Sequence, residues 1–387
     1  MRLLQTSVAG LIGLVAITSA SPQVAKRDAQ FNIGQPIDAN GKGAPILGGT
    51  NNAIDRENPD NLGRQSTDSG VVPNLKWRFS DSKTRIFNGG WVREQVIQDL
   101  PQSHDIAAAQ QHIKRGAWGF VYSGSIIIGA VGEDGRSQVE QLNYGDIWYF
   151  PKGAAHYVQG VAEESEFLLA FDEADFDKIG TTFNIVDWLA HTPRDILARN
   201  FGVNASVFDK LPATNPYILN GTVATTNVTV PPGQYLSGNS SFVYRTFEHP
   251  PEKVPGNGGE FRKIDSTNFP IAKTIAATFV TLKPGGLREL HWHPNGKATV
   301  FIGSAASRTF DLEAGDTAAF PDNSGHYIEN TSDTEDLVWI ELYKSDRVVD
   351  ISLTQWLALT PPEVVAQTLK VPLEFVKSLK QEKQILI

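Results

Sequence analysis

The sequence predicts a mainly β protein built from two small antiparallel β-barrels in tandem, each followed by a helical tail. Three observations support this fold class: an internal duplication, short runs rich in β-branched and aromatic residues, and a helical pattern that closes each copy. The 387 residues include 34 glycines and 22 prolines, a content that favours a loop-rich β architecture over a helical bundle.

The duplication consists of three segments that recur in the same order at a nearly constant offset of 168 to 170 positions. Each repeat is long enough to be a whole domain, which predicts two tandem domains and not a solenoid of small units. The matching pairs are IAAAQQHIKRGA (106–117) with IAATFVTLKPGG (275–286), YGDIWYFPKGAAHYVQG (144–160) with AGDTAAFPDNSGHYIEN (314–330), and VDWLAHTPRDILARNFGV (186–203) with LTQWLALTPPEVVAQTLKV (353–371).

Each copy ends with helix start and stop signals. In the first copy we predict a helix with Thr192 as its N-cap, Pro193 at the first helical position and Gly202 after its end. In the second copy residues 359–383 predict two helices.

The N-terminus has the pattern of a secretory signal peptide. Residues 1–20 carry one arginine, an apolar run and small residues around Ser19, and the dibasic Lys26-Arg27 pair would extend the processed segment to residue 27. We therefore expect a secreted, extracellular protein, with no membrane association once the signal is removed, because no later segment is apolar enough to span a bilayer.

The charge and composition of the chain limit the kinds of partner and of stabilisation that we expect. The formal net charge is −9, and removal of residues 1–27, which hold three basic and no acidic residues, makes it −12. An acidic chain without a basic tract argues against a nucleic-acid partner. The absence of cysteine means that the core, oligomerisation or a metal must stabilise a secreted chain without disulfides.

The domain boundaries follow from the repeats and from the distribution of N-glycosylation sequons. We expect residues 28–87 to form an N-terminal arm, 88–203 the first barrel, 204–262 a glycosylated linker with strands leading into the second barrel, and 263–387 the second barrel with its tail. Four of the five sequons fall in the linker, which indicates exposed loops. The sequons are at Asn204, Asn220, Asn227, Asn239 and Asn330.

Histidines in the second repeat form a candidate metal site. His291 and His293 flank a tryptophan, so on a strand both imidazoles point to the same face. A third histidine, His326, follows a tight Gly-Asp turn and a proline, and we expect it to enter the next strand aimed at the barrel interior. The first repeat has the equivalent histidine, His156, but no matching H-x-H pair.

These motifs carry a resemblance to a known family. H-x-H followed by G-x5-P-x4-H-x3-N is the two-part signature of the cupin superfamily. The tandem duplication, with RELHWHPN, GHYIEN, WYFPKGAAH and DWLAHTP, resembles the bicupin oxalate decarboxylases. The resemblance extends over about residues 36–380 and includes a strand-exchanging N-terminal segment. It therefore implies two tandem cupin barrels of the double-stranded β-helix, or jelly-roll, type.

The resemblance also implies a chemistry. In that family each barrel binds Mn²⁺ through three histidines and one glutamate, and oxalate is split to formate and carbon dioxide with dioxygen as co-reactant. Carried onto this chain, the metal ligands are His291, His293 and His326, with His156 as the remnant of the first site. Arg288 would polarise the substrate and Glu341 would donate the proton. Alternatively, Arg288 is an exposed or paired arginine and Glu341 its structural partner. The family also implies hexamers.

The sequence departs from the family in three places. About nine residues, including the glutamate ligand, are missing between Asn295 and Gly296, and a longer segment with the arginine, the H-x-H pair and the glutamate is missing between residues 117 and 118. These losses predict that the first barrel binds no metal. We hypothesise alternative splicing or a misplaced exon boundary, because both losses are clean and fall at the same place.

The third departure is in the lid loop of the first barrel, DFDKIGTTF, where Lys178 stands near the position of the family's proton-transfer glutamate. This change leaves open an oxalate oxidase that produces hydrogen peroxide. The lost ligands leave open a catalytically inactive cupin of the binding or storage type.

Overall fold

The computed structural model describes residues 68, 72–87, 90–113, 120–176, 185–213, 218, 221–222, 226, 232–294, 301–302 and 306–387. The predicted signal peptide, the processing site at residue 27 and most of the N-terminal arm lie outside these residues. Lys178 of the lid loop and both predicted deletion points also lie outside them.

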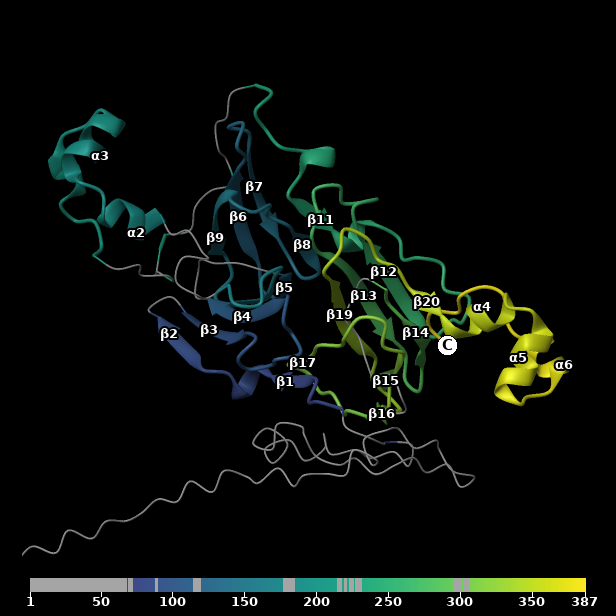
Figure 1. Cartoon of the computed structure of the whole chain (residues 1–387). Coiled ribbons are helices and arrows are strands. Elements are labelled where there is room, and N and C mark those ends of the chain that lie inside the picture. The colour runs from purple at the N-terminus through teal and green to yellow at the C-terminus, as the bar shows by residue number, and fades with distance from the viewer. Residues whose placement is uncertain are drawn as a thin grey trace, which may run out of the picture.

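The first half of the chain forms two sheets (Figure 1). One sheet has the order β2-β3-β4-β10-β5 and the other has the order β7-β6-β9, with antiparallel neighbours throughout. The strands are β2 (Thr84–Phe87), β3 (Gly90–Gln95), β4 (Ala107–Ile113), β5 (Phe120–Ser123), β6 (Ile126–Val131), β7 (Ser137–Leu142), β8 (Asp146–Trp148), β9 (Ala155–Gly160) and β10 (Ser165–Phe171).

The second half repeats this arrangement with an additional strand, β14, which carries His291 and ends one residue before His293. Its sheets have the orders β12-β13-β19, β18-β14-β20 and β15-β16. The strands are β12 (Gly259–Ile264), β13 (Ala276–Leu282), β14 (Leu287–Trp292), β15 (Phe301–Ile302), β16 (Ala306–Ser307), β17 (Asp316–Ala318), β18 (His326–Glu329), β19 (Leu337–Tyr343) and β20 (Ile351–Ser352).

The two halves exchange one strand each. β1 (Lys76–Arg78) precedes the first barrel but pairs with β17 of the second, and β11 (Val243–Arg245) precedes the second barrel but pairs with β8 of the first. The resemblance implied exchange by the N-terminal segment, and the structure shows that the exchange is reciprocal. It is reinforced by a hydrophobic cluster between the halves, in which Phe120 and Tyr149 pack against Phe279 and its neighbours.

Each half ends in a helical tail that projects away from the sheets (Figure 1). The helices are α2 (Ile185–Ala190), α3 (Arg194–Phe201), α4 (Leu353–Ala358), α5 (Pro362–Leu369) and α6 (Leu373–Lys377), and the short 3-10 turns are η3 (Phe79–Asp81), η4 (Ala205–Phe208), η5 (Gly238–Ser240) and η6 (Thr246–Glu248). Within the described part of the chain, no helix has the length and apolar character needed to cross a membrane.

The tails confirm the predicted helices with one correction at the first. Two helices, α5 and α6, fall within residues 359–383 as expected, and Gly202 ends α3 in the left-handed conformation at φ 66°. Thr192 is not the N-cap, however. Pro193 occupies that position, and the Thr192 hydroxyl donates back to the carbonyl of Trp188 at 2.7 Å. The threonine closes the turn after α2 because a hydroxyl can bond the carbonyl four residues earlier.

Candidate metal centre

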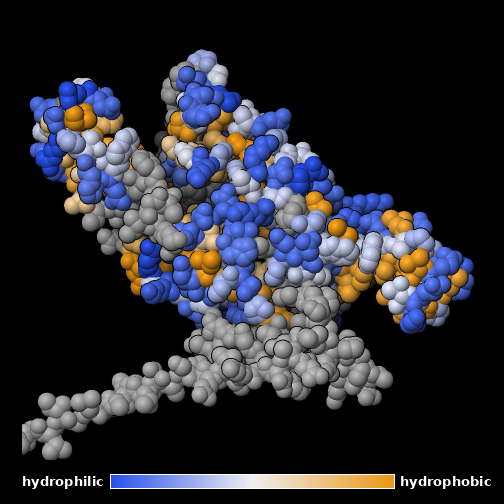
Figure 2. Space-filling view, in the orientation of Figure 1, coloured by the Kyte–Doolittle hydropathy of each residue, from blue (hydrophilic) through white to orange (hydrophobic). Residues whose placement is uncertain are grey.

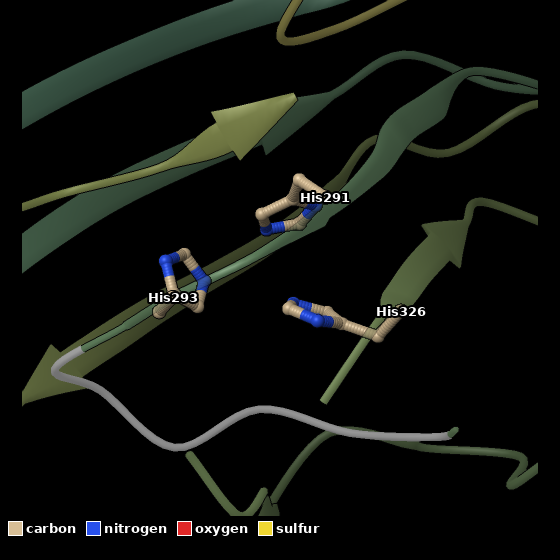
Figure 3. A group of neighbouring side chains, drawn as sticks. All are labelled: His291, His293 and His326. Atoms are coloured by element: carbon tan, nitrogen blue, oxygen red, sulfur yellow. The ribbon is translucent and has the colours of Figure 1, made fainter. Parts of the chain in front are cut away.

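Three histidines from two strands meet inside the second barrel (Figure 3). His291 and His293 come from β14 and its end, and His326 begins β18, where it lies directly across from His291. One ring nitrogen of each lies within 4.8 Å of those of the other two, and all three side chains are at least 95% buried. Histidine nitrogens this close together, shielded from solvent, can bind a single metal ion.

A β-bulge in β14 shapes the approach to this site. The pairing of β14 with β18 shifts register between Arg288 and His291, so three residues on one strand face two on the other. A bulge re-aims side chains locally. Arg288 is fully buried, and Asp350 connects it to His293: the arginine Nη2 is 2.7 Å from one carboxylate oxygen and the histidine Nδ1 is 2.8 Å from the other.

The three imidazoles have a fixed tautomer. Because a carbonyl oxygen only accepts hydrogen bonds, the Nδ1 atom that contacts it must carry the hydrogen, and the lone pair is left on Nε2. Such contacts orient metal-binding histidines and raise their basicity. The Nδ1 contacts are from His291 to the Glu289 carbonyl at 2.6 Å, from His326 to the Ser324 carbonyl at 3.1 Å, and from His293 to the Val349 carbonyl at 3.1 Å.

The site favours the neutral forms of His291 and His326. Burial lowers the pKa of His291 well below its usual value, and the charges of Arg288 and His326 act in the same direction. Burial also lowers the pKa of His326 to about 4, with the charge of His293 as the next cause. The Nε2 atom of His291 is buried without a hydrogen-bond partner among the described residues. A buried acceptor without a partner is costly, so a metal ion would satisfy it.

An ion network supports the histidines from one side. Burial alone would lower the pKa of Arg288, but the charges of Asp350 and Glu341 outweigh it and raise that pKa. Burial would raise the pKa of Asp350, and the charge of Arg288 outweighs it and holds that pKa below its usual value. One cation and two anions leave an excess negative charge beside the histidines, which favours a bound cation.

Glu341 accepts three hydrogen bonds that favour its ionised form. Its Oε2 accepts from the Thr278 hydroxyl at 2.6 Å and from the Tyr343 hydroxyl, and its Oε1 accepts from the Trp339 indole at 3.1 Å. Burial would raise the pKa of Glu341, but the charge of Arg288 lowers it below its usual value. As it stands, Glu341 is an acceptor, and it must take up a proton before it can donate one.

Sequence reasoning found five of these residues and missed Asp350. Arg288, Glu341 and the three histidines are brought together as expected. Asp350 lies 57 positions after His293 and belongs to no motif that the sequence analysis identified. A weak signal existed, because it stands directly before the tail segment that begins at β20, but only the tertiary fold shows that it contacts both Arg288 and His293.

His156 does not join a comparable group. It lies in β9 opposite Ala130 of β6, its side chain is exposed, and its ring stacks on Phe150 with 4.7 Å between ring centroids. Among the described residues, His291, His293 and His326 form the only group of three or more potential metal-binding side chains. Metal binding by the first barrel stays a matter of prediction.

The donor set fits a divalent transition metal at three positions. Imidazole nitrogen suits Zn²⁺, Cu²⁺, Fe²⁺ and Ni²⁺, whereas a carboxylate oxygen among the ligands favours Mn²⁺. The sequence from His293 to Phe310 contains no aspartate or glutamate, so the segment after the H-x-H pair cannot supply a carboxylate ligand. The histidines therefore provide a partial site for manganese, with Asp350 and Glu341 as nearby negative charge.

Comparison with known proteins identifies the family. The Cupin family model matches residues 99–208 and 245–377, one match in each half of the chain. A probable oxalate decarboxylase of Arthroderma benhamiae is 51% identical over 397 residues, which cover 97% of each protein. The oxalate decarboxylase OxdC of Bacillus subtilis is 40% identical over 380 residues, which cover 92% of this chain and 97% of that protein.

Solved structures agree with these relatives. A structure of oxalate decarboxylase from Bacillus subtilis at pH 4.6 matches with a TM-score of 0.78 at 38% identity, covering 92% of this chain and 98% of the other. A second structure of the same enzyme, from work on its Mn(II) centres, also has a TM-score of 0.78, at 36% identity over 92% of this chain and 99% of the other. The chain therefore belongs to the bicupin oxalate decarboxylase family of the cupin superfamily.

Proposed function

We propose that this protein is a manganese-dependent oxalate decarboxylase, a carboxy-lyase that converts oxalate and one proton to formate and carbon dioxide. The observation that carries the proposal is the convergence of His291, His293 and His326 beside Arg288 in the second barrel. The relatives named oxalate decarboxylase, at 40% to 51% identity over nearly the whole chain, support the substrate.

The residues divide the work as follows. His291, His293 and His326 would hold the ion, and manganese, when bound, supplies a Lewis acid and a one-electron redox centre for the reaction with dioxygen. Arg288 would bind a substrate carboxylate, since its Nε and Nη1 atoms are buried and have no hydrogen-bond partner among the described residues. Glu341 would deliver the proton that replaces carbon dioxide on the carbon of formate, after it has itself been protonated.

The missing segments weaken this activity and favour a second candidate function, an inactive cupin that binds but does not turn over its ligand. One relative aligns over 397 residues while covering 97% of this 387-residue chain, so it contains positions with no counterpart here. Loss of the carboxylate ligand would reduce manganese affinity, because the remaining donors are neutral imidazoles. Alternative splicing or a misplaced exon boundary remains our explanation, and genomic and transcript sequence across codons 117–118 and 295–296 would test it.

We also infer that the protein is secreted and glycosylated, on the basis of its signal-like residues 1–20 and its sequons. Asn204 and Asn239 are exposed, which suits a glycan. Asn330 does not suit one: it is 5% exposed, and its side-chain amide donates to the carbonyls of Leu282 and Glu335. Glycans are therefore expected on the linker and not on Asn330.

The helical tails support a homo-oligomer, which the family resemblance describes as a hexamer. Apolar side chains are exposed on both projecting tails (Figure 2). They include Trp188 at 60%, Phe201 at 55%, Trp356 at 54%, Val364 at 54% and Phe375 at 48% exposure. Burial of such residues against another copy would remove a large apolar surface from water.

The deciding experiment measures products and metal on the purified, secreted protein. Oxalate decarboxylase activity predicts formate and carbon dioxide in equal amounts and manganese bound to the protein. In the variant His291→Ala we expect neither product formation nor bound manganese. Hydrogen peroxide in place of formate would assign the oxidase reaction. Bound oxalate without turnover, at a manganese content below about 0.2 per chain, would favour the inactive cupin.

A further inference from the structure

The last residues of the chain lie along the first half of the metal-binding strand. The amide of Leu287 donates to the Ile387 carbonyl, and the amide of Ile387 donates to the Leu287 carbonyl, both at 2.8 Å. The amide of Glu289 donates to the Ile385 carbonyl at 3.0 Å. β20 covers only the end of β14, where it pairs with His291 and the following tryptophan, so the C-terminus covers the part that carries Arg288.

The C-terminal residues are tightly seated. Leu386 is fully buried in the core of the second barrel, packed with Phe261 and Val280. The backbone of Gly256 approaches it so closely that a Cβ atom there would lie 1.9 Å from the Leu386 carbonyl oxygen. The amide of Gly258 donates to the same oxygen at 3.2 Å. A position with this little space admits only glycine.

Glu289 ties this segment to the metal site. Its side chain is 2% exposed; Oε1 accepts from the Ile385 amide at 2.9 Å and Oε2 accepts from the Ser352 hydroxyl at 2.8 Å. The same Ser352 hydroxyl accepts from the Gln355 amide and so caps α4. The main-chain carbonyl of Glu289 accepts from Nδ1 of His291 at 2.6 Å. One residue inside the bulge therefore contacts the chain end, the tail helix and a metal-site histidine.

We propose that Glu289 and residues 385–387 form a latch that positions the metal-binding strand. The latch fixes the Glu289 carbonyl, the carbonyl fixes the ring of His291, and the ring presents Nε2 to the ion. Glu289 is a positioning residue, since its carboxylate contacts the chain end and Ser352 and none of the three histidine rings. Loss of a partner that orients a metal ligand typically lowers metal affinity 10- to 100-fold. The inference rests on the metal site of the proposed function.

Three variants of the full chain test the latch: Glu289→Gln, Gly256→Ala and deletion of Ile387. The last removes a side chain that is 50% exposed, so it costs little core packing while it removes the pairing with Leu287. Matched controls in the first half are Glu140→Gln, which alters a carboxylate bonded to Tyr235 and Arg245, and Gly221→Ala, where a Cβ meets nothing within 4 Å.

Binding of Mn²⁺ is measured by the loss of the free-ion signal in electron paramagnetic resonance, at a temperature where circular dichroism shows each variant folded. The latch predicts a Kd raised about 10- to 100-fold in the three variants, with an altered spectrum of the bound ion, and no change in the two controls. Binding within about twofold of the parent in folded Glu289→Gln and in the Ile387 deletion would overturn it.

Hydrogen exchange separates the latch from the proposed function. If the parent chain binds no Mn²⁺, the metal assignment fails, and the latch is judged on the amides of residues 287–292 alone. It predicts that these amides exchange about tenfold faster in Glu289→Gln than in the parent, while the amides of 276–282 in β13 do not change. Equal exchange in β14 of both proteins would overturn the latch whatever the metal result.

Discussion

The strand pair β13–β19 of the second barrel and the pair β4–β10 of the first have the same register, but the side chains inside the second barrel are polar and those inside the first are apolar. In the second barrel the paired strands β13 and β19 present polar side chains beside the histidines, whereas the equivalent positions of β4 and β10 in the first barrel are apolar. The equivalent pairs are Thr278 with Ala109, Glu341 with Leu169, and Tyr343 with Phe171. In the first barrel these residues belong to a hydrophobic cluster with Val92 and Phe176, in which Phe171 and Phe176 stack 3.8 Å apart.

One strand accounts for much of this difference. β14 lies between β13 and β15 in the second barrel, and it carries Arg288 and His291. Between the corresponding strands of the first barrel, β4 and β5, the sequence has residues 114–119, which lie outside the described part of the chain. Arg288 and His291 lie on β14 and His293 follows its end, whereas the sequence of the first repeat has no H-x-H pair.

The largest expected effect is on metal binding and activity, and it differs between a histidine of the second barrel and one of the first. Replacement of His293 by alanine should abolish Mn²⁺ binding and oxalate turnover, because the site has three donors and cannot spare one. Replacement of His156 by alanine should change neither quantity by more than about twofold. Metal titration and formate production measure both, and a loss of activity in the His156 variant would show that the first barrel takes part in the reaction.

The next effect concerns the ion network of the second barrel. The variant Arg288→Met should lower the free energy of unfolding by about 3–5 kcal/mol, because it leaves Asp350 and Glu341 as buried charges without their cation. Urea unfolding monitored by tryptophan fluorescence measures this change. A decrease below about 1 kcal/mol would mean that the carboxylates find other partners or water.

A variant in the first barrel tests how much its apolar interior contributes to stability. Leu169→Ala removes a side chain that is 6% exposed from the apolar cluster of the first barrel. The expected cost is about 2–5 kcal/mol in unfolding free energy, with Mn²⁺ affinity unchanged. If the same variant weakened Mn²⁺ binding when fully folded, the two interiors would be coupled and not independent.

The smallest expected effect is the pH dependence of metal binding. Burial lowers the pKa of His326 to about 4 and that of His291 well below its usual value, so protons compete with the metal only in strongly acidic solution. Between pH 7.5 and 5 these two histidines should reduce Mn²⁺ affinity less than about tenfold, whereas two ordinary histidines would reduce it about a thousandfold. Manganese titrations at both pH values measure the difference, and a thousandfold loss would indicate histidines exposed to water.

Patterns in the sequence predicted the tandem fold and the meeting of the three histidines. The duplication predicted the tandem barrels, the H-x-H spacing predicted that His291 and His293 share a face, and the Gly-Pro-His motif predicted that His326 joins them. The shared face of His291 and His293 depends on strand periodicity, and the entry of His326 into its strand depends on the turn residues just before it, whereas the duplication is visible only across the whole chain. The helix start was displaced by one residue because the Thr192 hydroxyl donates to the Trp188 carbonyl and does not cap α3, so Pro193 takes the N-cap position without a side-chain hydrogen bond.

The missed features all depend on contacts between distant parts of the chain. Asp350 and the C-terminal residues reach β14 only after the second barrel has closed, with 62 positions between Arg288 and its carboxylate partner. The bulge in β14 arises from its pairing with β18, which no single strand encodes. The domain boundaries, the secretion and the oligomeric state stay predictions.

The most direct measurement is the manganese content of the full chain, saturated with Mn²⁺ and freed of excess metal, in the parent, His291→Ala and His156→Ala proteins. We predict at most one ion per chain in the parent, the same content in His156→Ala, and none in His291→Ala. Two ions per chain, or a content that His291→Ala does not lower, would contradict a single metal centre built from the three histidines of the second barrel.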